Sequence, residues 1–90
     1  MILAIDVGNT HTVLGVYKET ELLFTFRMVT KAGKTEDELF SIILPVLQKR
    51  GFDTKDFSKL IIASVVPSVD FSYSELSSKY FSLSAQFVSP

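Results

Sequence analysis

Hydrophobic and polar residues alternate along the first third of the chain in a way that predicts three strands. Residues 2–7 are an apolar run typical of a buried strand, and residues 12–17 predict a second one. Gly8, Asn9 and Thr10 lie between them as a turn, so these two strands form a hairpin. After a polar turn at 18–20, residues 22–28 alternate as a half-buried strand does. The chain therefore opens with a three-stranded meander.

Helical spacing replaces this alternation after residue 34. Thr35 followed by Glu38 is the arrangement of a capping box, which marks the start of a helix. The apolar residues that then fall on one helical face are Leu39, Phe40, Ile43, Val46 and Leu47. Gly51 stands where a helix commonly ends. Because Pro45 removes a hydrogen bond inside this pattern, we expect one helix that is bent near its middle.

The last third of the chain predicts a strand, a helix and a strand. Residues 59–64 are rich in Leu and Ile, which suits a strand covered on both faces. Pro67 ends that element, and Ser68 can cap a helix whose apolar face carries Val69, Tyr73, Leu76 and Tyr80. Residues 85–88 predict one more strand. The order β-β-β-α-β-α-β indicates an α/β fold, a mixed sheet with helices on its faces, as in a ribonuclease-H-like half-domain.

Composition narrows the classes of function. Ninety residues with 47% hydrophobic content suffice for one domain with a real core. The net charge of -1 and the absence of a basic run argue against nucleic acid as a direct partner. The chain has no cysteine, which excludes disulfides and thiolate sites and fits the cytosol. The longest apolar stretch, residues 60–69, is interrupted and falls short of the ~20 residues that span a bilayer, so we expect a soluble protein without a membrane partner.

The first predicted turn carries the candidate chemistry. Asp6 ends a strand, Gly8 allows a ligand to approach the backbone, and Thr10 adds a hydroxyl beside several N–H donors. This combination can cradle a phosphate, and Asp6 can then hold Mg²⁺ through water. Asn9 tolerates unusual backbone angles and offers an amide donor. The residues alone leave a simpler alternative open, in which the cluster only makes a tight turn capped by Asp6.

Four segments in the same order resemble one family of kinases. Residues 6–10 (Asp-Val-Gly-Asn-Thr), which continue into 11–16, resemble the first phosphate motif of type III pantothenate kinases. Arg27, residues 34–39 (Lys-Thr-Glu-Asp-Glu-Leu) and residues 64–67 (Ser-Val-Val-Pro) resemble later segments of that family. Sugar kinases and actin share an Asp-x-Gly hairpin but generally not Gly-Asn-Thr in this setting. The resemblance covers nearly the whole chain and implies the N-terminal portion of an actin-like ATPase.

The resemblance implies phosphorylation of pantothenate to 4'-phosphopantothenate, the first step of coenzyme A synthesis, with ATP, Mg²⁺ and a potassium or ammonium ion. The implied ATP-phosphate loop consists of Asp6, Val7, Gly8, Asn9, Thr10, His11, Thr12 and Val13. The family's general base, pantothenate segment and monovalent-cation site lie in a later part of a longer chain, so no catalytic residue is expected before Pro90. We therefore expect residues 1–90 to be an incomplete half-domain that is inactive alone. A cytoplasmic homodimer is implied for the full-length protein.

Several other polar residues have structural explanations beside functional ones. His11 could be a base, but a lone histidine without a partner is better explained by a positional role. Arg27 on an alternating strand is expected to be solvated or ion-paired, and residues 64–67 are either a turn or a ligand-binding segment. The acidic residues at 36–38 complement the dipole of the helix that they begin.

Three alternative functions remain open at this point. The chain could belong to another actin-like small-molecule kinase with a different acceptor. It could be a non-catalytic regulatory relative resembling the Bvg accessory factor, which a basic, DNA-binding surface would favour and this composition does not offer. It could also be a purely structural interaction module.

Overall fold

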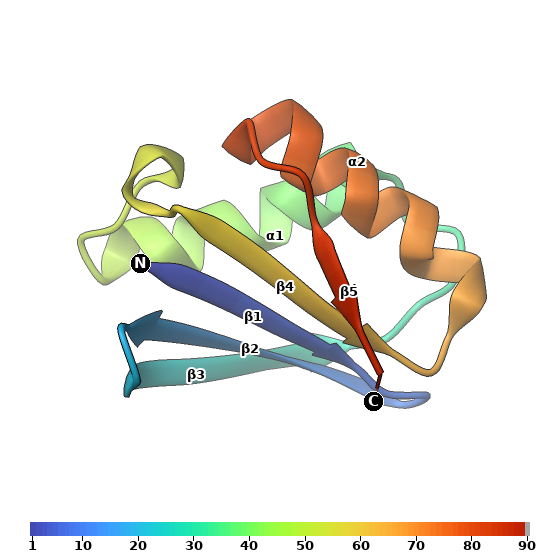
Figure 1. Cartoon of the computed structure of the whole chain (residues 1–90). Coiled ribbons are helices and arrows are strands. Elements are labelled where there is room, and N and C mark those ends of the chain that lie inside the picture. Colours follow the sequence, from blue (N-terminus) through green and yellow to red (C-terminus); the bar gives the residue numbers. More distant parts are fainter. Residues whose placement is uncertain (90) are drawn as a thin grey trace.

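Five strands form one mixed sheet in the order β3-β2-β1-β4-β5 (Figure 1). The computed structural model describes residues 1–89. The strands are β1 (Ile2–Val7), β2 (His11–Lys18), β3 (Glu21–Val29), β4 (Lys59–Ser64) and β5 (Gln86–Val88). β1, β2 and β3 pair antiparallel, whereas β4 is parallel to β1 and to β5. The predicted meander, the element order and the ribonuclease-H-like α/β fold are confirmed.

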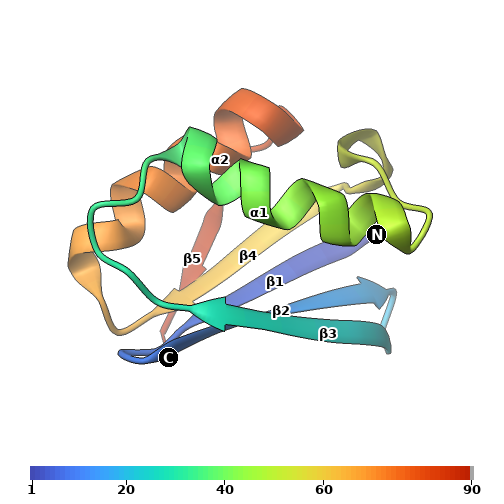
Figure 2. The ribbon, with the colours of Figure 1, turned by 180° about the vertical axis from the view of Figure 1, so that it is seen from behind.

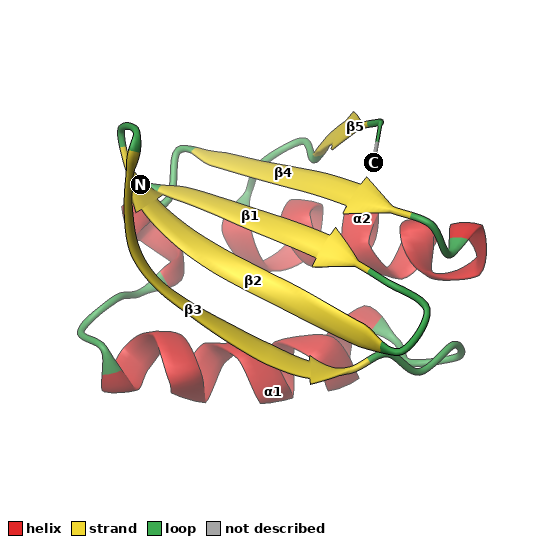
Figure 3. Cartoon of the chain, turned by 90° about the horizontal axis from the view of Figure 1, so that it is seen from below, coloured by secondary structure: helices red, strands yellow, loops and turns green. Residues whose placement is uncertain are grey.

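Two helices connect the strands and lie on one side of the sheet. The helix α1 (Glu36–Lys49) joins β3 to β4, and α2 (Asp70–Phe81) joins β4 to β5. Both connections link parallel strands and advance in the same direction across the sheet, so right-handed crossovers place both helices on the same face. Figure 2 and Figure 3 show this arrangement from behind and from below.

The core lies between the helices and alternate residues of the strands. From the sheet it contains Leu3, Ile5, Val7, Leu14, Val16, Leu60 and Ile62. From the helices it contains Leu39, Ile43, Leu47, Val69, Tyr73, Leu76 and Phe81. The period of 2 along each strand and the helical spacing predicted most of these positions. Phe40, Val46 and Tyr80, which were also expected on the inner faces, are half-buried.

The opposite side of the sheet, which we call the open face, has no helix over it within residues 1–89. Ile61 and Ala63 of β4 project there and are only partly buried. The prediction that β4 is covered on both faces is therefore wrong for the described residues. Its run of apolar residues could not reveal this, because the placement of the helices follows from the direction of the crossovers and not from the composition of the strand.

The ends of α1 follow the local sequence signals. The Thr35 hydroxyl accepts a hydrogen bond from the Glu38 N–H (3.2 Å), and the Glu38 carboxylate accepts one from the Thr35 N–H (3.1 Å), which confirms the capping box. Gly51 has φ of +86° and ends the helix in a left-handed conformation. The helix is continuous through Pro45, whose exposed position lets water reach the carbonyl that it leaves unpaired. The bend expected there stays a prediction.

The start of α2 differs from the prediction. Ser68 does not cap the helix; it lies within the short 3₁₀ helix η2 (Pro67–Val69), and no side chain caps the first turn of α2. Pro67 has a fixed φ that suits the beginning of a helical turn, so it starts the turn one residue before the expected cap. Ser is a residue type that often caps helices, but Ser68 lies inside a helical turn and lacks the extended backbone that a cap requires.

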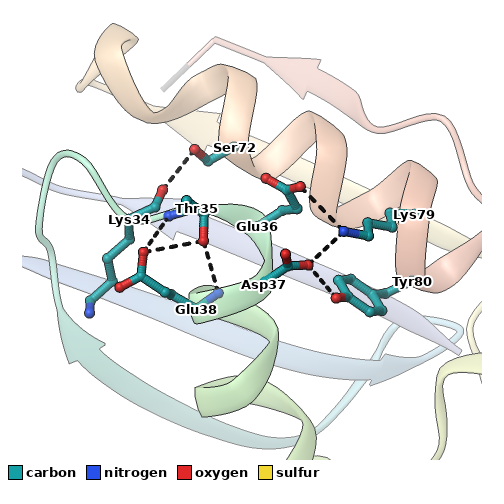
Figure 4. A network of polar contacts seen from close by, with 8 residues as sticks. All are labelled: Lys34, Thr35, Glu36, Asp37, Glu38, Ser72, Lys79 and Tyr80. Atoms are coloured by element: carbon teal, nitrogen blue, oxygen red, sulfur yellow. Dashed lines mark hydrogen bonds and ion pairs between the residues drawn. The ribbon is translucent and has the colours of Figure 1, made fainter.

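A polar cluster ties the first turn of α1 to the last turn of α2 (Figure 4). Lys79 Nζ lies 2.7 Å from Asp37 Oδ1 and 3.6 Å from a carboxylate oxygen of Glu36. The Tyr80 hydroxyl donates a hydrogen bond to Asp37, and the Tyr80 ring stacks on Phe40 with 3.8 Å between the ring centroids. Lys79 and Tyr80 lower the pKa of Asp37 from its ordinary value of 3.8. Glu36 and Asp37 in the first turn of α1 therefore bind the last turn of α2, and they also interact favourably with the dipole of α1.

We predict that Asp37→Asn destabilises the protein at neutral pH and that the difference disappears in acid. Because the folded state lowers the Asp37 pKa, the ionised carboxylate stabilises the fold above pH 3.8, and this contribution is lost as the pH falls through the lowered pKa. Thermal unfolding from pH 7 to pH 2.5 measures the effect, with Glu21→Gln at the start of β3 as the control. A difference between Asp37→Asn and wild type that stays constant in acid would contradict this role of the charge.

Candidate functional site

The turn between β1 and β2 lies at the edge of the sheet where β1 and β4 end side by side (Figure 3). The Val65 N–H, just beyond β4, donates to the Val7 carbonyl at 3.1 Å. This hydrogen bond holds the segment 64–67 against the turn. The carboxyl ends of parallel strands are where ligands of open α/β sheets gather, so this edge is the candidate functional site.

Two backbone donors of the turn are unused. The Gly8 N–H donates to the His11 carbonyl at 3.0 Å and closes the hairpin. The N–H groups of Asn9 and Thr10, both exposed residues, donate to no other atom within residues 1–89. Adjacent backbone N–H groups that point away from the protein can bind the oxygens of an anion. The turn therefore offers a donor pair of the kind that a phosphate group requires.

Gly8 is required by the turn itself. A Cβ atom at this position would lie 2.9 Å from the His11 carbonyl oxygen, which is closer than real side chains come. Close approach of a ligand was the reason expected from the sequence, and the closing hydrogen bond of the hairpin supplies a second reason that does not need a ligand. The presence of glycine at position 8 is therefore compatible with a simple hairpin turn and with a phosphate-binding turn.

Asp6 presents its carboxylate on the open face, beside the turn. It is exposed, is paired across the sheet with Val13 and Ala63, and forms no ion pair within residues 1–89. The residue borders an open depression of about 320 Å³ over the middle strands. The described residues contain no group of three or more His, Cys, Asp or Glu that could hold a metal ion. A single free carboxylate fits a hydrated Mg²⁺, which takes its other ligands from water and substrate phosphates.

The remaining residues of the predicted loop divide between the two sides of the sheet. Val7 and Thr12 are completely buried beneath the helices, so their side chains are out of reach of a ligand at the turn. His11 and Val13 are exposed at the start of β2. The loop that the resemblance implies as one unit therefore has an outer part that can meet a ligand and an inner part that belongs to the core.

The side chains of Ser64 and Arg27, the other candidate ligand-binding residues, make no hydrogen bond or ion pair with the turn within residues 1–89. The Ser64 hydroxyl bonds to both the N–H and the carbonyl of Val66, at 3.1 and 3.2 Å, which is the geometry of a local turn. Arg27 is exposed on β3, opposite Val13, and makes no ion pair within the described residues. Neither side chain reaches the turn through a contact seen here.

Sequence reasoning missed two polar residues near this edge. Thr30 contacts the turn with its backbone and lies beside the buried Thr12 hydroxyl, although nothing in the periodicity marks it. Asp70, at the start of α2, has a buried carboxylate oxygen without a hydrogen-bond partner among residues 1–89. The one sequence feature that could have marked Asp70 as a candidate is its position as an acidic residue directly after Pro67-Ser68-Val69.

The strand order and the crossovers define a ribonuclease-H-like α/β fold, with the turn at the carboxyl end of β1 as its candidate site. The crystal structure of the Aquifex aeolicus member of the Ppx/GppA family is similar to the chain, with a TM-score of 0.50 over 99% of this chain and 35% of that chain. At 17% sequence identity, this likeness shows the fold alone.

The chain belongs to the type III pantothenate kinase family, whose model matches residues 2–90. Over its whole length it is 40% identical to a type III pantothenate kinase of Halalkalibacterium halodurans and 43% identical to one of a Geobacillus species. It spans 35% of the length of these curated relatives. The family resemblance inferred from the four sequence segments is thereby confirmed. Within residues 1–89, neither helix has the length and apolar character needed to cross a membrane.

We predict that Gly8→Ala destabilises the fold by about 1–2 kcal/mol, because the added methyl group would push the His11 carbonyl out of the hydrogen bond that closes the hairpin. Urea denaturation measures the change, and Asn9→Ala at the neighbouring exposed position is the control. Equal stabilities of the two variants would show that the turn tolerates a side chain at position 8.

Proposed function

We propose that residues 1–90 are the N-terminal ATP-phosphate-binding half-domain of a longer enzyme. That enzyme transfers the γ-phosphoryl group of ATP to the primary hydroxyl of pantothenate, which yields 4'-phosphopantothenate in the first step of coenzyme A synthesis. Membership of the type III pantothenate kinase family supports this reaction. The observation that carries the phosphate role is the pair of unused N–H groups at Asn9 and Thr10, beside the free carboxylate of Asp6.

The turn and Asp6 have complementary tasks in this proposal. The N–H groups of Asn9 and Thr10 donate to phosphate oxygens, and the Thr10 hydroxyl adds a further donor. Asp6 would hold hydrated Mg²⁺, which when bound neutralises charge on the phosphates. Phosphoryl transfer depends mainly on such positioning and electrostatic stabilisation, so a site without a nucleophile or base can supply half of the catalytic machinery.

The other half of the machinery is assigned to the part of the enzyme beyond residue 90. His11 is exposed at the start of β2, and its imidazole has no hydrogen-bond partner among residues 1–89, so we give it a positional role rather than that of a base. The general base, the pantothenate-binding segment and a site for potassium or ammonium belong to the remainder. A cytoplasmic homodimer completes the proposal and rests, like the cation, on the resemblance to the family.

The direct test is turnover with ATP and pantothenate. The full-length enzyme should form 4'-phosphopantothenate and ADP in equal amounts, and the 90-residue chain should form neither, because it lacks a base and an acceptor site. Coupled ADP release and mass spectrometry of the product measure both reactions. Turnover by the 90-residue chain would contradict the division of labour, and phosphorylation of another small molecule in place of pantothenate would contradict the acceptor.

We predict that Asp6→Asn in the full-length enzyme lowers kcat by about 10²-fold or more while pantothenate binding and the fold are retained. The amide keeps the size of the carboxylate and removes the charge that orients hydrated Mg²⁺ against the phosphates, and loss of one preorganised electrostatic contact has an effect of this order. Steady-state kinetics at varied Mg²⁺ and thermal unfolding measure the two consequences. The matched control is Glu21→Gln, at the opposite end of the sheet. Wild-type turnover combined with a lower unfolding temperature would mean that Asp6 only caps the hairpin.

A further inference from the structure

Thr30, the residue that follows β3, contacts the turn region at two points. Its backbone N–H donates to the Thr10 carbonyl at 2.9 Å, and its hydroxyl lies 2.8 Å from the Thr12 hydroxyl. These two contacts fall on either side of His11 in the sequence. Thr30 therefore holds the chain at the entry to β2 on both sides of His11, in addition to the pairing of β2 with β1 and β3.

The hydroxyl pair is largely shielded from water. Thr12 is completely buried and Thr30 is half-buried, which strengthens the hydrogen bond between them relative to an exposed one. Tyr73 of α2 is also buried next to this pair, and burial raises the pKa of its phenol. Thr30 and Tyr73 line the same small cavity, together with Val69 of η2.

The segment after Thr30 is fixed to α2 as well. The Ser72 hydroxyl donates to the Lys34 carbonyl at 2.8 Å (Figure 4). Thr30 thus belongs to the segment between β3 and α1. This segment contacts α2 through Lys34 and contacts the β1–β2 turn through Thr30. Movement of Thr30 would change the orientation of the Thr10 carbonyl and, with it, the backbone next to the free Thr10 N–H.

We propose that Thr30 is a positioning residue that fixes the phosphate-binding turn through the Thr10 carbonyl and the Thr12 hydroxyl. The inference rests on the proposed function of the turn. A donor pair that is already oriented before the nucleotide arrives loses less conformational freedom on binding, and displacement of such groups by a fraction of an ångström weakens the contact. The specific consequence is an effect on ATP that does not extend to pantothenate.

The competing explanation is that Thr30 only satisfies the buried Thr12 hydroxyl. Two variants separate the explanations. Thr30→Val removes the hydroxyl and keeps the backbone N–H and the side-chain shape, so it leaves Thr12 with one partner fewer. The double variant Thr12→Val/Thr30→Val removes both hydroxyls of the pair, so Thr12 no longer has a buried hydroxyl that lacks its partner. Its stability can therefore exceed that of Thr30→Val.

The experiment measures the KM values for ATP and pantothenate and the unfolding temperature of the full-length enzyme. We expect Thr30→Val to raise the KM for ATP about 3- to 10-fold, as loss of one hydrogen bond does, with the KM for pantothenate unchanged. Thr30→Ser should restore the wild-type value. The double variant should recover the unfolding temperature and keep the raised KM for ATP. Thr20→Val in the distant β2–β3 turn is the control for the same substitution.

The outcomes distinguish this inference from the proposed function when Asp6→Asn is measured in parallel. If Asp6→Asn reduces turnover while Thr30→Val and the double variant change only the unfolding temperature, the positioning role is overturned and the phosphate role of the turn stands. If Asp6→Asn behaves as wild type, the phosphate role fails and the positioning role fails with it. If Thr30→Val does not fold, the double variant decides through its KM for ATP.

Discussion

The central position of β1 is the constraint on which the rest of the structure depends. β1 pairs antiparallel with β2 on one side and parallel with β4 on the other, residue by residue over its full length. This double pairing brings the β1–β2 turn and the segment after β4 to one edge of the sheet, although they are separated by more than fifty residues in the sequence. Leu3, Ile5 and Val7 anchor the strand beneath the helices, which leaves Asp6 on the other face. The candidate site is thus a consequence of how one buried strand is paired.

The turn owes its shape mainly to backbone interactions. Gly8 closes the hairpin through the His11 carbonyl, the Thr10 carbonyl is held by Thr30, and Val65 fixes the end of β1. These contacts use carbonyl groups and leave the N–H groups of the exposed residues Asn9 and Thr10 without a partner among residues 1–89. A turn of this kind presents donors without a flexible side chain, and it therefore suits a reaction in which positioning matters more than covalent chemistry.

The sequence predicted the features that depend on neighbouring residues and missed those that depend on distant ones. The strands of the meander, the capping box at Thr35 and the glycine at position 51 all follow from local patterns, and the structure contains each of them. The cap predicted at Ser68 is wrong, because the type of a residue does not determine its backbone angles. The one-sided cover of β4 and the contact between Thr12 and Thr30 involve segments far apart in the chain, so no local pattern encodes them. At the site, residue types alone could not choose between a phosphate cradle and a simple turn; the ordered resemblance of four segments identified the family, and the roles of the individual residues remain proposals.

The most direct measurement of the central claim is nuclear magnetic resonance of the backbone amides in the full-length enzyme, titrated with Mg²⁺ and a non-hydrolysable ATP analogue. The account predicts that the amide resonances of Asn9 and Thr10 shift most among residues 1–89, because their free N–H groups bind phosphate oxygens. Amides in the distant β2–β3 turn should not respond. Saturable binding of the analogue with unchanged resonances at Asn9 and Thr10 would contradict the account.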